Sequence, residues 1–172
     1  LAPLANLPIV SLNLWQTKVN HLRPLAGMPL RELYLAFTAV NDLTPLRGAP
    51  LQSLTVAYAP ITDLAPLKGM PLLHLYLSNT KVKDLTPLES MHLESLHLDR
   101  TPIINLNALK GMPLRRLRLE GCSRLTDLSP LAHCPNLEVL ILPPSHGDIS
   151  HLKKLPKLRR LSYHFDLDER KI

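Results

Sequence analysis

The chain has 172 residues and a net charge of +6; 45% of its residues are hydrophobic, but only 4% are aromatic. This length fits one domain, and the apolar content excludes a disordered chain. The 17 prolines exclude long helices and coiled coils, the two cysteines exclude a disulfide framework, and no apolar run reaches the roughly 20 residues of a membrane-spanning helix.

A repeat with a period of 21 residues organises the chain. The copies open with the pattern L-x-x-L-x-L, with Ile9, Val56 and Tyr163 as substitutes for one leucine each, and the regular copies continue as x-x-T-x-V/I-x-D-L-x-P-L-x-G-M-P. The copies open at Ile9, Leu30, Leu51, Leu72, Leu93, Leu114, Leu137 and Leu158. A period kept this long predicts stacked units, each of which buries its apolar side against its neighbours.

Each copy is expected to form one short strand and one short return segment. Side chains alternate along a strand, so Leu33 and Leu35 should point inward while Glu32, Tyr34 and Ala36 point outward. The return segment is too short for a long helix and is expected to be a single helical or 3₁₀ turn. Aspartates just before it are interpreted as structural caps rather than catalytic groups: Asp42, Asp63, Asp84 and Asp127, with Asn105 in the same place.

The regularity fails after Cys122, where the sixth copy holds two extra residues. We therefore predict a solenoid over residues 1–161, with about seven repeats of 21–23 residues and the first one truncated, followed by a C-terminal tail or cap over residues 162–172. Cys122 and Cys134 fall at inward positions and are expected to be small buried hydrophobic residues; a disulfide or redox pair is the alternative.

These motifs resemble the leucine-rich repeat family. The short back half D-L-x-P-L is similar to the internalin-like and phosphatase-regulatory classes of that family. Strings such as DLTPLRGAPL and DLAPLKGMPL also resemble the C-terminal repeats of serine/threonine protein kinases of planctomycete-type bacteria. The resemblance implies a right-handed α/β solenoid, a horseshoe arc with a short-stranded parallel sheet on its concave side and 3₁₀ or irregular segments on its convex side.

The chain itself contains no kinase motif, so a fused kinase domain is expected only upstream of Leu1. The chain starts in mid-repeat and carries neither an initiator Met nor a signal-peptide pattern. We therefore expect a piece of a longer bacterial protein, and the absence of a leader favours a cytoplasmic location.

The outward positions form columns across the predicted sheet, and five of the seven aromatic residues fall on them or at their rim. Aromatic side chains are enriched in interface hot spots, so this pattern favours a binding surface; cross-strand packing is the alternative. Arginines of the C-terminal half would add charge selectivity. The candidate partner-binding residues are Trp15, Tyr34, Phe37, Tyr58, His74, Tyr76, His97, Arg116 and Arg118.

The predicted function is non-catalytic recognition of a protein partner through the concave face. A structural spacer is the first alternative, and an acidic ligand or nucleic acid bound by the Arg-rich half is the second. Nucleic acid is not expected, because a further column alternates in sign and so predicts cross-strand ion pairs: Glu94, Arg115, Glu138 and Arg159.

No cofactor, metal or catalytic residue is expected. His74, His97 and Asp99 lie on neighbouring predicted strands, and two histidines with a carboxylate can bind a metal in principle. The two histidines differ by one column as well as one strand, however, so they are interpreted as solvated surface side chains.

Overall fold

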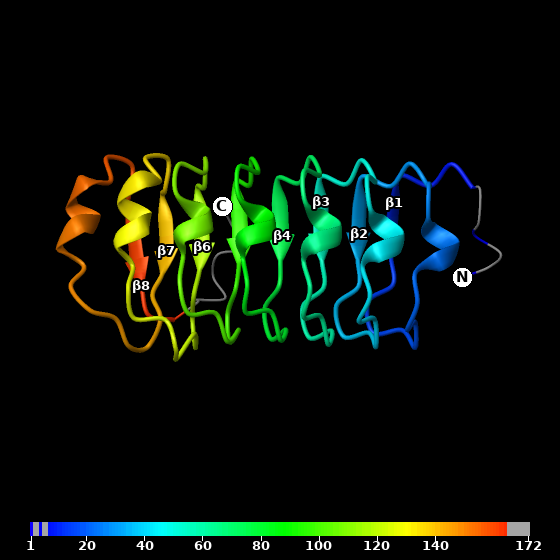
Figure 1. Ribbon diagram of the computed structural model, residues 1–172, viewed down its shortest axis with the longest axis horizontal. Helices are drawn as coiled ribbons and strands as arrows, with labels where there is room; N and C mark the ends of the chain where they lie inside the picture. Colours follow the sequence, from blue (N-terminus) through cyan, green and yellow to red (C-terminus); the bar gives the residue numbers. More distant parts are fainter. Residues whose placement is uncertain (2–3, 5–6, 165–172) are drawn as a thin grey trace.

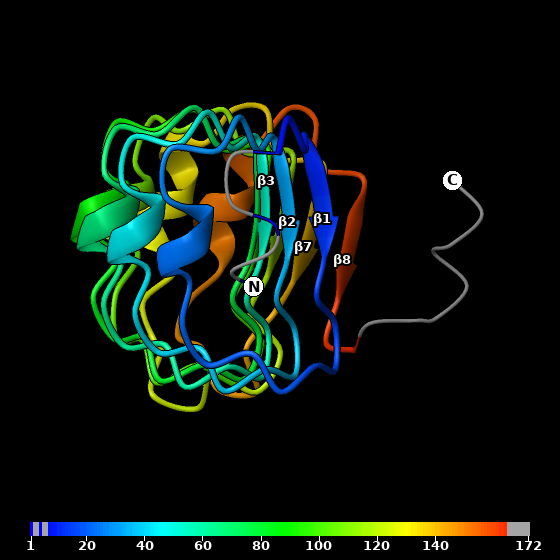
Figure 2. The same ribbon diagram turned by 90° about the vertical axis from the view of Figure 1, so that its right-hand side faces the viewer.

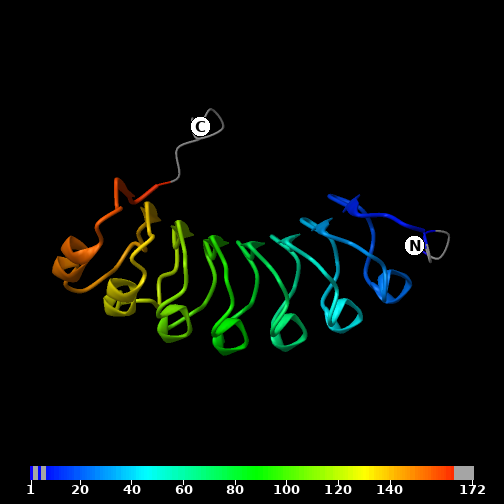
Figure 3. The same cartoon turned by 90° about the horizontal axis from the view of Figure 1, so that it is seen from above.

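The computed structural model describes Leu1, Leu4 and residues 7–164. The repeats stack in chain order along the long axis of the molecule (Figure 1). Seen from above, they form a shallow arc whose inner side is lined by strands and whose outer side carries short helical turns (Figure 3). The arc, the concave sheet and the irregular convex side predicted from the repeat are all confirmed.

Eight parallel strands of three residues form one sheet in sequential order. They are β1 (Ser11–Asn13), β2 (Glu32–Tyr34), β3 (Ser53–Thr55), β4 (His74–Tyr76), β5 (Ser95–His97), β6 (Arg116–Arg118), β7 (Val139–Ile141) and β8 (Arg160–Ser162). Each pairs in register with the equivalent residues of the next repeat, as Tyr76 does with His97 and His97 with Arg118. The predicted outward columns are therefore confirmed.

The described convex segments are 3₁₀ turns rather than α-helices. They are η2 (Arg23–Leu25), η3 (Thr44–Leu46), η4 (Ala65–Leu67), η5 (Thr86–Leu88), η6 (Asn107–Leu109), η7 (Ser129–His133) and η8 (Ser150–Lys154). Viewed along the solenoid, they lie opposite the sheet (Figure 2). No described helix has the length and apolar character needed to cross a membrane.

The predicted aspartate row caps these turns. Each carboxylate oxygen accepts the backbone N–H of the first residue of its turn, two positions ahead; Asp42, for example, bonds the Thr44 amide at 2.8 Å. The Asp84 carboxylate accepts both the amide and the hydroxyl of Thr86. These hydrogen bonds lower the pKa of the Asp84 carboxyl, so the row has the structural role expected of it.

Leucine columns fill the space between the sheet and the turns. The leucines at the first, fourth and sixth positions of the central copies are fully buried, including Leu72, Leu75 and Leu77. Burying one such side chain stabilises the fold by ~2 kcal/mol. In β8, the last described strand of the column, Leu161 is 45% exposed, because none of the described residues stacks on it from a following repeat.

Both cysteines lie in this core, as predicted, and both are free. Their thiols donate to different backbone carbonyls, Cys122 to Leu98 at 3.0 Å and Cys134 to Leu109 at 3.1 Å. Burial raises the pKa of the Cys134 thiol to about 11. Of the predicted tail over 162–172, residues 165–172 lie outside the described residues, so its role as a cap stays a prediction.

Two positions of each repeat place the backbone in the left-handed region. One follows the 3₁₀ turn and holds Gly27, Gly48, Gly69 and Gly111, with Ser90 in the fourth copy. The other, just after the strand, holds Gln16, Phe37, Tyr58, Asn79, Arg100 and Gly121. Glycine and asparagine suit this conformation, whereas large side chains strain it. The chain therefore follows the glycine preference at the first position and departs from it at the second.

Candidate functional site

Three aromatic rings form a continuous row along the rim where β1, β2 and β3 end. The Phe37 and Tyr58 rings stack with their centroids 4.1 Å apart and their planes 12° apart. The Trp15 ring meets Phe37 edge-on at 6.2 Å. The exposed fractions are 53% for Trp15, 45% for Phe37 and 46% for Tyr58. We call these three residues the aromatic rim.

Two rings of the aromatic rim stand on strained backbone. Phe37 has a φ of 58° and Tyr58 a φ of 61°. A left-handed conformation costs a residue with a side chain roughly 1–2 kcal/mol. It persists here because the main chain is held from the next repeat: the Phe37 amide donates to Ala57 O at 2.9 Å and the Tyr58 amide to Ser78 O at 2.9 Å. Strain of this kind is concentrated at functional sites.

Two further tyrosines stand on the concave face itself. Tyr34 on β2 and Tyr76 on β4 are half-buried and flank Thr55 of β3. The Tyr34 hydroxyl donates to the Glu32 carboxylate at 3.4 Å. Partial burial, followed by the negative charge of Glu32, raises the pKa of Tyr34. Together with the aromatic rim, these rings give the N-terminal half of the face an aromatic surface with little charge.

A polar cluster occupies the centre of the concave face. The His97 ring packs against Tyr76 with centroids 4.5 Å apart, and its Nε2 lies 3.5 Å from the Ser95 hydroxyl. Asp99 is 5% exposed; it pairs with Arg118 at 3.0 Å and accepts the Ser78 hydroxyl at 2.9 Å. Burial raises the pKa of the Asp99 carboxyl, although the Arg118 guanidinium opposes this shift. These contacts fix Arg118 in the floor of the face.

The interpretation of His97 as a solvated side chain is wrong. Burial, followed by the charges of Arg118 and Arg116 and by His74, lowers the pKa of His97 to about 3. The imidazole is therefore neutral at physiological pH. His74 is half-buried rather than solvated as well, and its Nδ1 has no hydrogen-bond partner among the described residues.

Other side chains that point outward from the sheet are also buried. Ala36, Ser95 and Ile141 occupy outward positions and are buried. Neighbouring strands lie only about 4.8 Å apart, so long side chains such as arginine and tyrosine cover small ones beside them.

The C-terminal half of the face carries arginines with different roles. The predicted ion-pair ladder is confirmed between Arg115 and Glu138 and between Arg159 and Glu138, both at 2.9 Å. Arg116 is exposed and makes no ion pair with any residue that the structure describes. The pairing of Arg115 and Arg159 with one carboxylate breaks up the basic stripe that a phosphate backbone would need.

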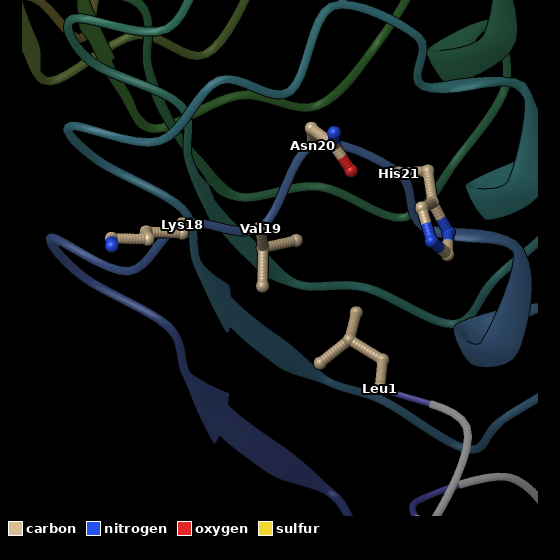
Figure 4. A pocket seen from close by; sticks show the side chains of 5 residues that line it. All are labelled: Leu1, Lys18, Val19, Asn20 and His21. Carbon is tan, nitrogen blue, oxygen red and sulfur yellow. The ribbon is translucent and has the colours of Figure 1, made fainter.

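No catalytic or metal centre emerges from the described residues. They contain no group of three or more His, Cys, Asp or Glu side chains able to hold a metal ion. A hollow of about 270 Å³ lies at the N-terminal end of the solenoid, lined by Leu1, Lys18, Val19, Asn20 and His21 (Figure 4). Its described lining holds one imidazole and one ammonium but no carboxylate, thiol or hydroxyl side chain beside them.

Six of the nine predicted site residues come together in two groups, while Tyr34, His74 and Arg116 lie on the face beside them. Trp15, Phe37 and Tyr58 come together in the aromatic rim, and Tyr76, His97 and Arg118 come together in the polar cluster. The first and last of these strands are five strand spacings apart, about 24 Å. One extended partner could therefore cover both groups. The strained backbone of the rim was not predicted, although Asn79 and Gly121 at the same repeat position are a readable signal of it.

Comparisons with known proteins agree with this architecture. No family model matches the chain, and no curated protein sequence matches it. The crystal structure of an internalin (inlF) from Listeria monocytogenes is similar with a TM-score of 0.78 and 29% identity, over 94% of this chain and 56% of the internalin. Internalin C2 of the same organism gives a TM-score of 0.78 and 25% identity, over 90% of this chain and 70% of the internalin. The chain thus spans little more than half of the first internalin.

Proposed function

We propose that this chain, a leucine-rich-repeat solenoid of the internalin type, is a non-catalytic module that binds a protein partner through its concave face and aromatic rim. One observation carries the proposal. Three large rings are exposed side by side, and two of them stand on backbone that disfavours them. Asparagine or glycine would satisfy that backbone at lower free energy, so packing of the solenoid does not account for the rings.

The spacer alternative explains less. A spacer needs the leucine columns and the capped turns, both of which are independent of the rim. Ring stacking returns roughly 0.5–1.5 kcal/mol per pair, about as much as the strain costs, so stability gains little from Phe37 and Tyr58. Exposed aromatic clusters are typical of interface hot spots.

The geometry also suits recognition. Eight strands at about 4.8 Å span about 34 Å, which is the breadth of an ordinary protein interface. The sheet is held by main-chain hydrogen bonds along its whole length, so a partner would meet a surface that is already ordered. Little conformational entropy would then be lost on binding.

We also propose a more specific context for the module, fusion to a kinase. The similarity of the D-L-x-P-L strings to kinase-appended repeats supports a module fused to a bacterial serine/threonine kinase and selecting its partners. Reading the gene upstream of Leu1 tests this, since a glycine-rich loop and a catalytic-loop H-R-D are required there. A complete upstream frame without them refutes the kinase context and leaves the binding proposal untouched.

The binding proposal is tested with a double variant, Phe37→Asn with Tyr58→Asn. Asparagine tolerates left-handed backbone, so the fold should be kept while both rings are lost. The matched control is Arg47→Ala with Lys68→Ala, two exposed side chains on the convex side. Each protein is used for affinity capture from the organism that encodes it, with quantitative mass spectrometry.

We expect a partner retained by the wild type and the convex control to be depleted at least tenfold with the rim variant. Circular dichroism at the capture temperature checks that all three proteins are folded. An identical capture profile for the folded rim variant and the wild type would assign the solenoid to the spacer role.

A further inference from the structure

Two arginines and two carboxylates surround the polar cluster, but the carboxylates are already engaged by groups of the chain. Facing the His97 ring are His74 and Tyr76 from β4 and two arginines, Arg116 and Arg118, from β6. Two carboxylates, those of Asp99 and Glu120, lie nearby, each two residues after the end of its strand, β5 or β6. Asp99 is already held by Arg118, the Ser78 hydroxyl and the Glu120 amide, while the Glu120 carboxylate lies 3.6 Å from His164 Nδ1.

Arg116 is the group through which this surface can reach a partner. It stands on the exposed side of β6, in the column between Ser95 and Val139. The two nearby arginines, Arg115 and Arg118, each form an ion pair with a carboxylate of the chain. Arg116 forms none with the described residues. A guanidinium presents a fork of donors that matches one carboxylate.

We propose that β4–β6 of the concave face take an acidic segment of a protein partner, with one aspartate or glutamate carboxylate paired to Arg116 beside the His97 ring. This inference rests on the proposed function and names the chemistry of its partner. The unpaired guanidinium supplies the charge complement, and the neighbouring Tyr76 and Val139 supply apolar surface for the rest of the segment.

A peptide fits this surface better than a nucleic acid. A nucleic-acid strand needs several cations in a row to neutralise successive phosphates. Here Glu138 engages the arginines on both of its sides, Arg115 and Arg159, so the cations do not form the continuous row that successive phosphates need. One carboxylate needs only one guanidinium.

Docking of an acidic segment would be coupled to proton uptake. The free protein keeps His97 neutral because burial and the neighbouring cations disfavour the imidazolium. A carboxylate within about 4–6 Å raises the pKa of a histidine by roughly 1–3 units. Starting from a pKa of about 3, a rise in the upper part of this range, roughly 2–3 units, brings the pKa of His97 in the complex to about 5–6, so the acidic segment would bind about two- to tenfold more tightly at pH 5 than at pH 7.

The probe is an N-acetylated, C-amidated hexaaspartate peptide, because aspartate remains ionised at pH 5. Hexaglutamine is the uncharged control. The intact ¹⁵N-labelled chain is titrated at pH 7 and pH 5 at constant ionic strength and followed by NMR. We expect saturable shifts at the Arg116 Nε–H and the His97 ring with hexaaspartate only. The affinity should be higher at pH 5 by the factor given above.

Two variants separate charge pairing from proton uptake. Arg116→Gln should weaken hexaaspartate at least tenfold, whereas Lys110→Gln, an exposed convex lysine, should leave it unchanged. In His97→Phe the ratio of the affinities at pH 5 and pH 7 should fall to about one, whereas His74→Gln should keep the pH dependence. The chemical shifts of the free variants show whether each is folded.

Several results would overturn the inference. They are equal affinity of Arg116→Gln and wild type, an unchanged pH dependence in His97→Phe, or tighter binding of a single-stranded oligonucleotide than of hexaaspartate. A fourth concerns the chain's own acidic residues Asp166, Asp168 and Glu169. If hexaaspartate bound only after these residues were replaced by the corresponding amides, the chain's own acidic segment would be the ligand of this surface. Loss of a partner from the rim variant would still support the proposed function in each case.

Discussion

Replacing His97 by phenylalanine should remove a large part of the acid sensitivity of the fold. Native His97 has a pKa of about 3, whereas an unfolded histidine titrates near pH 6.5. Below that pH the unfolded chain binds one more proton than the native chain. The contribution of the neutral ring is therefore fully present above about pH 6.5 and is lost as the pH falls from there toward 3.

The size of this loss follows from the two pKa values. Between pH 8 and pH 4 one histidine with these values lowers the free energy of unfolding by about 3 kcal/mol. Asp99 acts in the opposite sense, because its raised pKa lets the native state take up a proton first as the pH falls. Comparing the wild type with His97→Phe at each pH cancels that contribution, since both chains contain Asp99.

The measurement is urea denaturation followed by circular dichroism at pH 4, 5, 6, 7 and 8. Phenylalanine keeps a ring against Tyr76, and this column already accepts tyrosine in two other repeats. The stability of the variant relative to the wild type should rise by about 3 kcal/mol between pH 8 and pH 4. Parallel stability curves for the two proteins would show that the histidine is solvated in solution and that its neighbours do not hold it neutral.

Three smaller perturbations test the solenoid itself, each by urea denaturation at pH 7. Leu75→Ala, at a fully buried position, should cost about 2–5 kcal/mol, and Leu161→Ala at the open end well under half of that; equal losses would contradict a column whose last member is uncovered. Asp84→Ala should cost about 1 kcal/mol and Asp84→Asn much less, because the amide oxygen still accepts the turn N–H; a larger loss for asparagine would argue against capping. Ser90→Gly should stabilise by about 0.5–1 kcal/mol by relieving left-handed backbone, whereas Ser53→Gly on β3 should destabilise; the same sign for both would contradict that reason.

The repeat made most of the architecture predictable. Because the period fixes which leucine follows which, the register of all seven strand pairs could be read before any coordinates, including the two-residue insertion that shifts Leu140 against Leu117. The aspartate row was predictable for the same reason. A short side-chain acceptor before a Leu-x-Pro-Leu segment has few other uses.

Burial within the concave face was not predictable from alternation. Alternation gives the direction of a side chain, and exposure depends on what its neighbours cover. Ser95, His97 and Asp99 all lie on the outer side of the sheet, yet Ser95 and Asp99 are buried and His97 is half-buried, with Tyr76 packed against His97 and Arg118 paired with Asp99. A one-dimensional pattern contains the identity of these neighbours but not the conformations in which they fold over the face. The neutral histidine was missed for this reason.

The two left-handed positions of the repeat differ in how strictly the fold restricts the residue type. After the 3₁₀ turns of the five regular copies, four have glycine at the left-handed position, and the fifth has the small residue Ser90. After the strand, the next repeat holds the backbone by an amide hydrogen bond at each copy from Gln16 to Arg100, so the conformation no longer depends on the residue placed there. The side chain at this position is therefore free to vary with function. Phe37 and Tyr58 occur in adjacent copies, stacked and exposed, and the fold does not require either ring at this position, so they are the residues on which the proposed binding role rests.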